Sequence, residues 1–266
     1  MIIFSLINMK GGVGKTTIST NLAVDFANRG VKVLFIDNDE QNNSSLFFNV
    51  SNEKKTLSSL YMEPSMDINE IIYSTKYKNI DCIPAGLNLN NILTLYLEDE
   101  RFKNVDKSII LKNKLSTISD KYDICIMDNH PGITVATYNG LMAANLVIIV
   151  TDTNIYAKQG LDTMIEYLNA IKIDRKNYCK DYDDGILTKS INLCGCLVNK
   201  YIYNPNFSKK KKYNYFKTNI RMVPRNKLYL FDSAIISNKS FIELAPRSNF
   251  SRDIKKLVDE IIKKII

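Results

Sequence analysis

The feature that most constrains this chain is a glycine-rich segment between an apolar run and a predicted helix. The run at residues 2–7 has the composition of a strand, and residues 10–17, KGGVGKTT, follow it closely. Because glycine lacks a Cβ, this backbone can approach an anion closely. The helix that follows points its free N–H groups and the positive end of its dipole at the same place. The segment therefore predicts a loop that binds phosphate.

Two side chains of this loop have specific tasks in phosphate binding. A lysine at position 15 reaches the β- and γ-phosphates of a nucleotide, and the Thr16 hydroxyl binds Mg²⁺. The general phosphate-loop pattern expects a glycine where this chain has Met9, so that pattern is incomplete here. The residues predicted to bind nucleotide in this loop are Gly11, Gly12, Val13, Gly14, Lys15, Thr16 and Thr17.

The segment resembles the deviant Walker A motif of the ParA/MinD family of ATPases, which tolerates several residues at the Met9 position. The resemblance implies ATP and Mg²⁺ as ligands, slow ATP hydrolysis, and a homodimer that ATP closes. In that family the first lysine of the motif is a signature residue that contacts the phosphates bound by the partner chain. The resemblance gives this catalytic role to Lys10, in addition to Lys15.

Two carboxylates follow the next apolar run. Residues 33–43, VLFIDNDEQNN, resemble the second signature of the family, D-x-D-P-Q-x-N. By this resemblance, Asp37 lies near the hydration shell of the metal, and Asp39 orients or activates the water that attacks ATP. Glu40 replaces the usual proline, which leaves both acids in place.

A third acid ends another apolar run. Residues 122–128, YDICIMD, resemble a Walker B strand, and Asp128 would hold Mg²⁺ through water because Mg²⁺ dehydrates reluctantly. The only histidine of the chain, His130, follows two residues later. It either titrates or bonds phosphate at the site, or is an ordinary loop residue.

Three later segments extend the resemblance in the same order along the chain. Asn199 follows an apolar run and resembles the asparagine that contacts adenine in the family. Residues 223–226, VPRN, resemble the I-P-R-N segment that borders the base, which marks Pro224 and Arg225. Residues 245–248, APRS, resemble the D-P-R-S segment before the final helix.

Strand-like runs alternate with helical stretches along the whole sequence. Strands are expected at 2–7, 31–36, 80–84, 123–127, 146–150, 192–198 and 219–223, and helices at 16–28, 109–119, 160–171 and 250–266. This alternation predicts the α/β class, with a mostly parallel twisted sheet and helices on both faces, as in P-loop NTPases. Functional groups then collect at the carboxyl ends of the strands. We expect one ATPase domain over residues 1–266, without an N-terminal DNA-binding extension.

The balance of charge indicates an anionic partner. The chain has 36 Lys and Arg against 28 Asp and Glu, a net charge of +8. This favours nucleic acid or an acidic lipid surface, although a lysine-rich surface is the simpler interpretation. Five cysteines without metal-binding spacing indicate reduced thiols. Without a signal-like N-terminus or an apolar run near ~18 residues, a cytoplasmic location is expected.

The resemblance is greatest to ParA (Soj-like) partition ATPases. It implies an ATP-dependent dimer that binds nonspecific DNA, associates with the nucleoid, and meets a ParB-like centromere-binding adaptor. The candidate DNA-binding residues are Arg247, Lys209, Lys210, Lys211, Lys212 and Arg252.

Two other functions were compared with this one. A MinD-like ATPase would bind a membrane through the amphipathic segment 250–266, which is an open alternative although membrane binding is not expected. An electron-transfer ATPase similar to the nitrogenase iron protein is excluded, because residues 129–135 and 138–144 contain no cysteine to hold its cluster.

Overall fold

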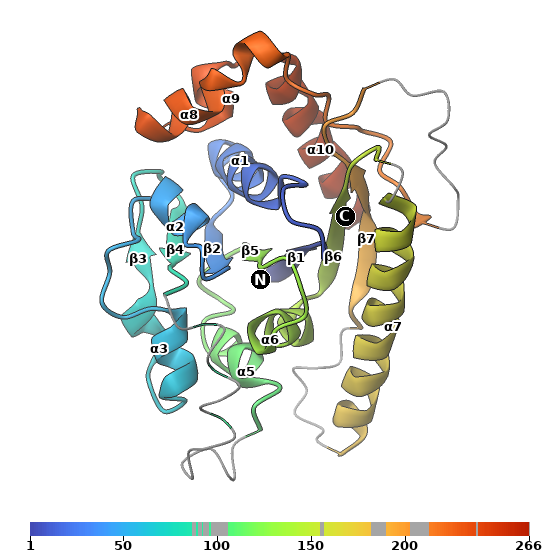
Figure 1. Ribbon diagram of the computed structural model, residues 1–266. Helices are drawn as coiled ribbons and strands as arrows, with labels where there is room; N and C mark the ends of the chain where they lie inside the picture. Colours follow the sequence, from blue (N-terminus) through green and yellow to red (C-terminus); the bar gives the residue numbers. More distant parts are fainter. Residues whose placement is uncertain are drawn as a thin grey trace.

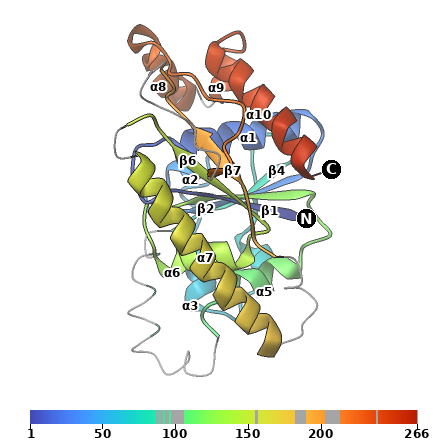
Figure 2. The same cartoon turned by 90° about the vertical axis from the view of Figure 1, so that its right-hand side faces the viewer.

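A seven-stranded sheet forms the centre of the protein, and helices cover both of its faces (Figure 1, Figure 2). The computed structural model describes residues 1–86, 89, 92, 96, 106–154, 157–181, 190–202, 213–237 and 239–265. The strand order is β3-β4-β2-β5-β1-β6-β7, and neighbouring strands are parallel except for the antiparallel pair β3 and β4. The predicted α/β class with a mostly parallel sheet is confirmed.

The strands agree closely with the apolar runs of the sequence. They are β1 (Ile2–Ile7), β2 (Val33–Asn38), β3 (Tyr73–Ser74), β4 (Ile80–Ile83), β5 (Ile124–Asn129), β6 (Leu146–Thr151) and β7 (Asn192–Val198). Almost every residue of the five longest strands, β1, β2, β5, β6 and β7, is buried, which explains their continuous apolar composition. The predicted strands at 2–7 and 192–198 coincide with β1 and β7.

The predicted strand at 219–223 is not formed. Residues 213–223 run beside β7 and the residues that follow it, and form isolated bridges there, Cys196 with Tyr215 and Tyr201 with Arg221. Lys200 has a φ of 52°, in the left-handed region, so the extended backbone is interrupted directly after β7 and regular pairing does not continue.

The helices form one layer on each face of the sheet (Figure 2). One layer contains α1 (Lys15–Asn28), α8 (Tyr229–Ile236), α9 (Phe241–Leu244) and α10 (Asn249–Ile265). The other contains α3 (Leu57–Met62), α5 (Ile110–Ser116), α6 (Val135–Ala143) and α7 (Ala157–Asp181). The short helix α2 (Asn43–Phe47) follows β2 near one end of the sheet, and 3-10 turns lie at Ile68–Ile71 and Arg225–Lys227.

Each helical layer packs on its own apolar core. Leu22 of α1 and Leu257 of α10 meet Phe4 and Phe35 on one face of the sheet, whereas Leu141 of α6 belongs to the core on the other face. Burying a side chain of this size contributes about 1.5–3 kcal/mol. The apolar residues of α10 are thus part of the protein core: Ile254, Leu257, Val258 and Ile261 are all buried.

Candidate nucleotide-binding site

The glycine-rich loop joins β1 to α1 at the carboxyl edge of the sheet. Gly12 and Gly14 have φ values of 73° and 93°, which glycine adopts without the steric cost that a Cβ brings. Asn8 anchors the start of the loop, because its side-chain amide donates to the Val150 carbonyl at 2.6 Å and its oxygen accepts the Lys10 N–H at 2.8 Å. No described side chain caps the first turn of α1, so its N–H groups remain available to an anion.

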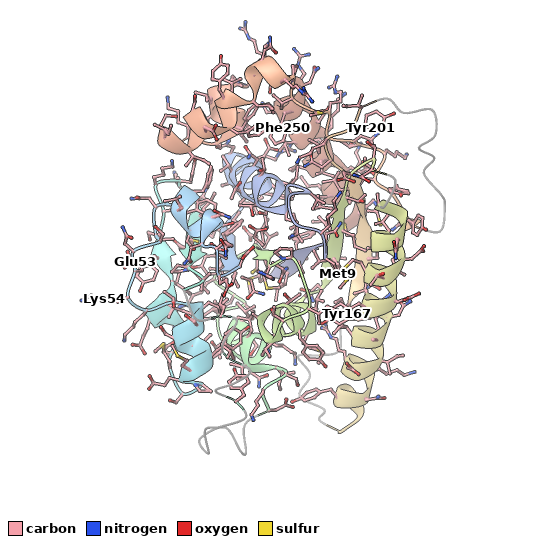
Figure 3. The ribbon with its side chains drawn as sticks, viewed as in Figure 1. Met9, Glu53, Lys54, Tyr167, Tyr201 and Phe250 are labelled. Carbon is pink, nitrogen blue, oxygen red and sulfur yellow. The ribbon has the colours of Figure 1, made fainter. Side chains whose placement is uncertain are left out.

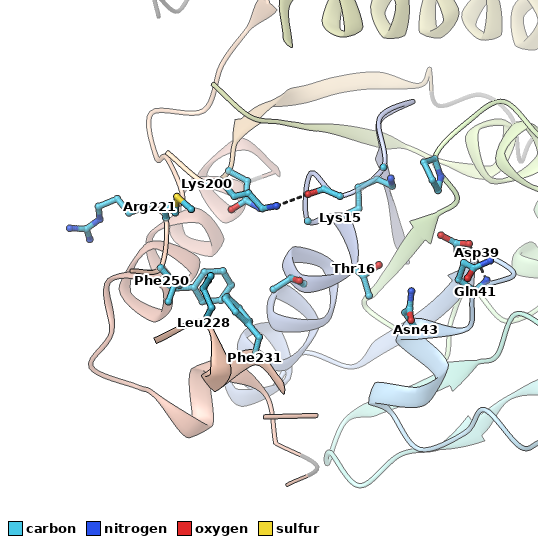
Figure 4. Close-up of a pocket in the computed structure, with 18 residues that line it drawn as sticks. Lys15, Thr16, Asp39, Gln41, Asn43, Lys200, Arg221, Leu228, Phe231 and Phe250 are labelled. Carbon is cyan, nitrogen blue, oxygen red and sulfur yellow. Dashed lines mark hydrogen bonds between the residues drawn. The ribbon is translucent and has the colours of Figure 1, made fainter. Parts of the chain in front are cut away.

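A pocket of about 610 Å³ opens beside this loop (Figure 4), a volume within the usual range for small-molecule sites. At one end, Lys15, Thr16 and Asp39 provide polar groups, and at the other, Leu228, Phe231 and Phe250 provide an apolar wall. The full lining is Gly11, Gly12, Gly14, Lys15, Thr16, Thr17, Asp39, Gln41, Asn43, Pro131, Asn199, Lys200, Arg221, Met222, Val223, Leu228, Phe231 and Phe250. Such a pocket suits a ligand with an anionic end and a flat apolar end.

Lys15 is the buried cation of the pocket. Its ammonium group lies 3.4 Å from the Asn8 carbonyl, to which it donates. Burial lowers the pKa of Lys15, and the charges of Asp128 and Asp39 act in the opposite direction. Lys15 thus lines the pocket at the start of α1, and its role in phosphate binding stays a prediction.

Asp37 and Asp128 lie side by side at the ends of β2 and β5, where the strand register pairs them directly. The Asp37 carboxylate accepts hydrogen bonds from the N–H and the hydroxyl of Ser45, both at 2.7 Å. One oxygen of Asp128 accepts the Ser44 hydroxyl at 2.6 Å. The other, Oδ1, is buried and has no hydrogen-bond partner among the described residues.

Burial makes the charged forms of both acids unfavourable. The pKa of Asp37 is raised to about 7, mainly by burial and in part by the nearby charge of Asp128. Burial also raises the pKa of Asp128, although hydrogen bonds from Ser44 and Thr16 and the charge of Lys15 act in the opposite direction. A cation beside these acids would offset the free-energy cost of burying their charged carboxylates.

These residues fit a magnesium ion. The unpartnered Asp128 oxygen, the Asp37 carboxylate and the Thr16 hydroxyl are the hard oxygen ligands that Mg²⁺ prefers. The described parts of the chain contain no group of three or more His, Cys, Asp or Glu that could hold a metal ion. A few protein ligands supplemented by water and phosphate are typical of Mg²⁺ sites that act on nucleotides.

Asp39 and Asn199 also line the pocket. Asp39 is 9% exposed, and its carboxylate accepts the Gln41 N–H at 3.1 Å. Asn199 donates from its amide to the Val13 carbonyl at 2.7 Å, and a Cβ placed on Gly14 would lie 2.3 Å from the same amide nitrogen.

The predicted base-bordering pair lies just outside this pocket. Pro224 and Arg225 line a neighbouring pocket of about 360 Å³, whereas Met222 and Val223 border both pockets. Their contact with a base stays a prediction.

Lys10 lies outside the pocket that its own loop forms. Its ammonium group pairs with Asp152 at 2.8 Å, just beyond β6, and its side chain is 45% exposed. Met9, before it, is also exposed (Figure 3). The Nδ1 atom of His130, directly after β5, is buried without a hydrogen-bond partner among the described residues.

The two candidate DNA-binding residues that the structure describes, Arg247 and Arg252, do not line the pocket. Arg247 and Arg252 are exposed before and within the first turn of α10. Lys209, Lys210, Lys211 and Lys212 lie outside the described residues.

Three features of the site were not indicated by any sequence motif. Ser44 and Ser45 bond the two buried acids, Lys200 donates to the Gly12 carbonyl at 2.7 Å, and α8 provides part of the apolar wall. The serines could have been found, since they lie only five and six residues after Asp39. Lys200 could not, because its contact spans 188 positions.

Known proteins resemble this chain in both sequence and fold. A family model described as an AAA domain matches residues 1–180. The sporulation initiation inhibitor protein Soj of Bacillus subtilis is 29% identical over 97% of each chain. The chromosome-partitioning ATPase Soj of Treponema pallidum is 32% identical over 62% of this chain and 63% of its own length. The chain belongs to this AAA domain family, in its ParA/MinD group. It spans 58% of the length of two Mycobacterium tuberculosis relatives of uncharacterised function, which are 28% identical over 70% of this chain.

Solved structures also have the same fold as this chain. Apo McdA of Cyanothece covers 100% of both chains with a TM-score of 0.76 at 20% identity. A Borrelia burgdorferi plasmid partition protein bound to AMPPNP has a TM-score of 0.73 at 23% identity, over 100% of this chain and 99% of its own. MinD of Pyrococcus horikoshii complexed with Mg-ADP has a TM-score of 0.72 at 20% identity, over 98% and 96%.

Proposed function

We propose that this chain is a ParA-type partition ATPase that binds and hydrolyses ATP with Mg²⁺, in one domain over residues 1–266. The observation that carries the proposal is the meeting of the glycine loop and Lys15 with Asp39 and Asp128 at one edge of the sheet. The likeness to Soj proteins and to a partition protein bound to AMPPNP supports it.

Different residues of the pocket have different roles in ATP binding and hydrolysis. The loop N–H groups and Lys15 hold the phosphates, and the apolar end near Phe231 takes the adenine, with Asn199 beside it. Thr16 and Asp128 would hold Mg²⁺, with Asp37 bonding its water; when bound, the ion neutralises charge on the phosphates. Asp39 orients the attacking water toward the γ-phosphate. Hydrolysis of this kind depends mainly on positioning and charge stabilisation.

The position of Lys10 supports a shared site in a homodimer. Its side chain is exposed and does not line its own pocket, so it is available to a second chain once its pair with Asp152 opens. Lys10→Ala should therefore reduce ATP hydrolysis and leave most ATP binding intact. An unchanged rate of hydrolysis would remove Lys10 from the mechanism.

The ATP-bound dimer binds nonspecific DNA. The net charge of +8 and the exposed cations just before α10 and along its first half, Arg247, Arg252, Lys255 and Lys256, support an electrostatic interface. Such binding releases counterions and weakens steeply with salt. A centromere-bound, ParB-like adaptor accelerates hydrolysis, after which the dimer opens and leaves the DNA. The protein then acts in the cytoplasm at the nucleoid.

A gel shift on nonspecific DNA tests this proposal. With ATP the wild-type chain should shift DNA, whereas ADP or no nucleotide should not. Asp39→Ala should retain the ATP-dependent shift because hydrolysis no longer opens the dimer, and Asp120→Ala, at an exposed position, should behave as wild type. A shift that is equal in all three nucleotide states would contradict an ATP-controlled dimer.

The structure gives less support to the MinD-like alternative. The apolar face of α10 packs into the core through Ile254, Leu257, Val258 and Ile261, so this face is not free to enter a lipid surface. None of the helices in the described part of the chain is long and apolar enough to cross a membrane. Recovery of the chain with anionic vesicles in an ATP-dependent flotation experiment would restore the alternative.

A further inference from the structure

Lys200 links the end of β7 to the phosphate loop. It follows Asn199 directly, and its φ of 52° turns the backbone so that the side chain extends along the pocket wall. Its ammonium group donates to the Gly12 carbonyl at 2.7 Å, which the dashed line in Figure 4 marks. A left-handed backbone at a residue other than glycine has a steric cost, so this placement is specific.

Two consecutive side chains thus bind two consecutive loop carbonyls. Asn199 binds the Val13 carbonyl at 2.7 Å, and Lys200 binds the Gly12 carbonyl. A phosphate loop turns its N–H groups toward the anion, which leaves its carbonyls in need of other partners. A charged donor makes a stronger hydrogen bond than a neutral one, so the Lys200 contact is the firmer of the two.

Among the described residues, Lys200 also differs from two other cations near the pocket in its charge partners. Lys10 pairs with Asp152, and Arg221 pairs with Asp253. No carboxylate of the described residues forms an ion pair with Lys200. A positive charge beside the loop attracts an anion over several ångströms, and more strongly where water is partly excluded.

We propose that Lys200 is a positioning residue that holds the phosphate loop in its binding shape before the nucleotide arrives, and that its charge increases affinity for the nucleotide phosphates. A loop that is already ordered loses less conformational freedom when ligand binds, which strengthens binding. The inference rests on the proposed function, since it takes ATP as the ligand. It assigns Lys200 to ground-state binding and not to the chemical step.

Three variants test the role of the side chain. Lys200→Ala removes the bond and the charge, Lys200→Arg retains both, and Lys200→Gly removes the side chain while relieving the left-handed backbone. Lys121→Ala is the matched control, because Lys121 is exposed and donates to Asn69 away from the pocket. All are compared in amide hydrogen exchange without nucleotide and in equilibrium ATP binding.

The expected result separates binding from chemistry. Exchange at residues 11–16 should become faster in Lys200→Ala and Lys200→Gly, and affinity for ATP should fall about tenfold in both. KM should rise, with kcat changed less than about twofold, since the interaction is made equally in the ground and transition states. Lys200→Arg should restore the affinity to within about threefold of wild type.

Failure of the inference can be distinguished from failure of the proposed function. If the wild-type chain does not bind ATP, the proposed function fails. Hydrogen exchange in the nucleotide-free chain still tests the contact between Lys200 and the loop. Unchanged exchange in Lys200→Gly overturns the positioning role. Unchanged ATP affinity in a chain that binds ATP overturns the assignment of Lys200 to nucleotide binding.

Discussion

Replacing Gly14 by alanine should destabilise the nucleotide-free chain by about 2–3 kcal/mol. The new Cβ would occupy a left-handed backbone with φ of 93°, which costs about 1–2 kcal/mol for a residue other than glycine. It would also lie 2.3 Å from the Asn199 amide nitrogen, so Asn199 must move. Moving it breaks the 2.7 Å bond to the Val13 carbonyl, which costs about 1 kcal/mol more.

Gly30 provides a matched control for the backbone term. Its φ is 87°, and a Cβ there would meet nothing within 4 Å. Gly30→Ala should therefore cost only the left-handed strain, about 1–2 kcal/mol. The difference between Gly14→Ala and Gly30→Ala measures the contact with Asn199.

Urea unfolding of the two single variants and the double variant isolates that contact further. Asn199→Ala alone should cost about 1 kcal/mol, and together with Gly14→Ala the costs should fall short of additivity by about 1 kcal/mol, since both changes break the same bond. Additive costs, or equal costs for Gly14→Ala and Gly30→Ala, would show that Asn199 does not contact the loop in solution. The reasoning about how β7 supports the loop would then be refuted.

Two further outcomes follow from the buried charges. Because burial raises the pKa of Asp37 to about 7 from its usual 3.8, the folded chain binds more protons than the unfolded chain between these values, so this residue makes stability fall as pH rises through that window. We expect the free energy of unfolding of wild type, measured with urea and without nucleotide relative to that of Asp37→Asn, to fall by about 2 kcal/mol between pH 5 and pH 7. A difference in free energy between the two proteins that does not change with pH would contradict this. Asp253→Asn should lower stability by about 1–2 kcal/mol, because the buried carboxylate accepts three hydrogen bonds from Arg221. It should also weaken ATP binding, since Arg221 borders the pocket. Wild-type stability of this variant in thermal melts would refute the reasoning.

The parts of the fold that depend on local pattern were predictable. β1, the glycine loop and α1 follow one another within 28 residues, and their apolar and glycine positions specify them directly. The convergence of Asp37 and Asp128 was expected from their positions at strand ends, and the register of β2 and β5 confirms it. Their roles in catalysis stay predictions.

Contacts that depend on distant segments were not predictable. The pair Lys10–Asp152 joins residues 142 positions apart, and the contact of Asn199 with Val13 spans 186 positions. The short helices α2, α8 and α9 have four to eight residues, too few for a helical period to be recognised in the sequence. The apolar wall that α8 gives to the pocket was missed for the same reason.

The most direct test of the account is equilibrium binding of ATP with Mg²⁺ to wild type, Lys15→Ala and Lys121→Ala. Lys15 is the buried cation of the pocket, whereas Lys121 is exposed away from it. The account predicts that wild type and Lys121→Ala bind ATP equally, and that Lys15→Ala, while still folded by circular dichroism, loses affinity by about a hundredfold or more. Tight binding retained by a folded Lys15→Ala chain would contradict the assignment of this pocket to the nucleotide.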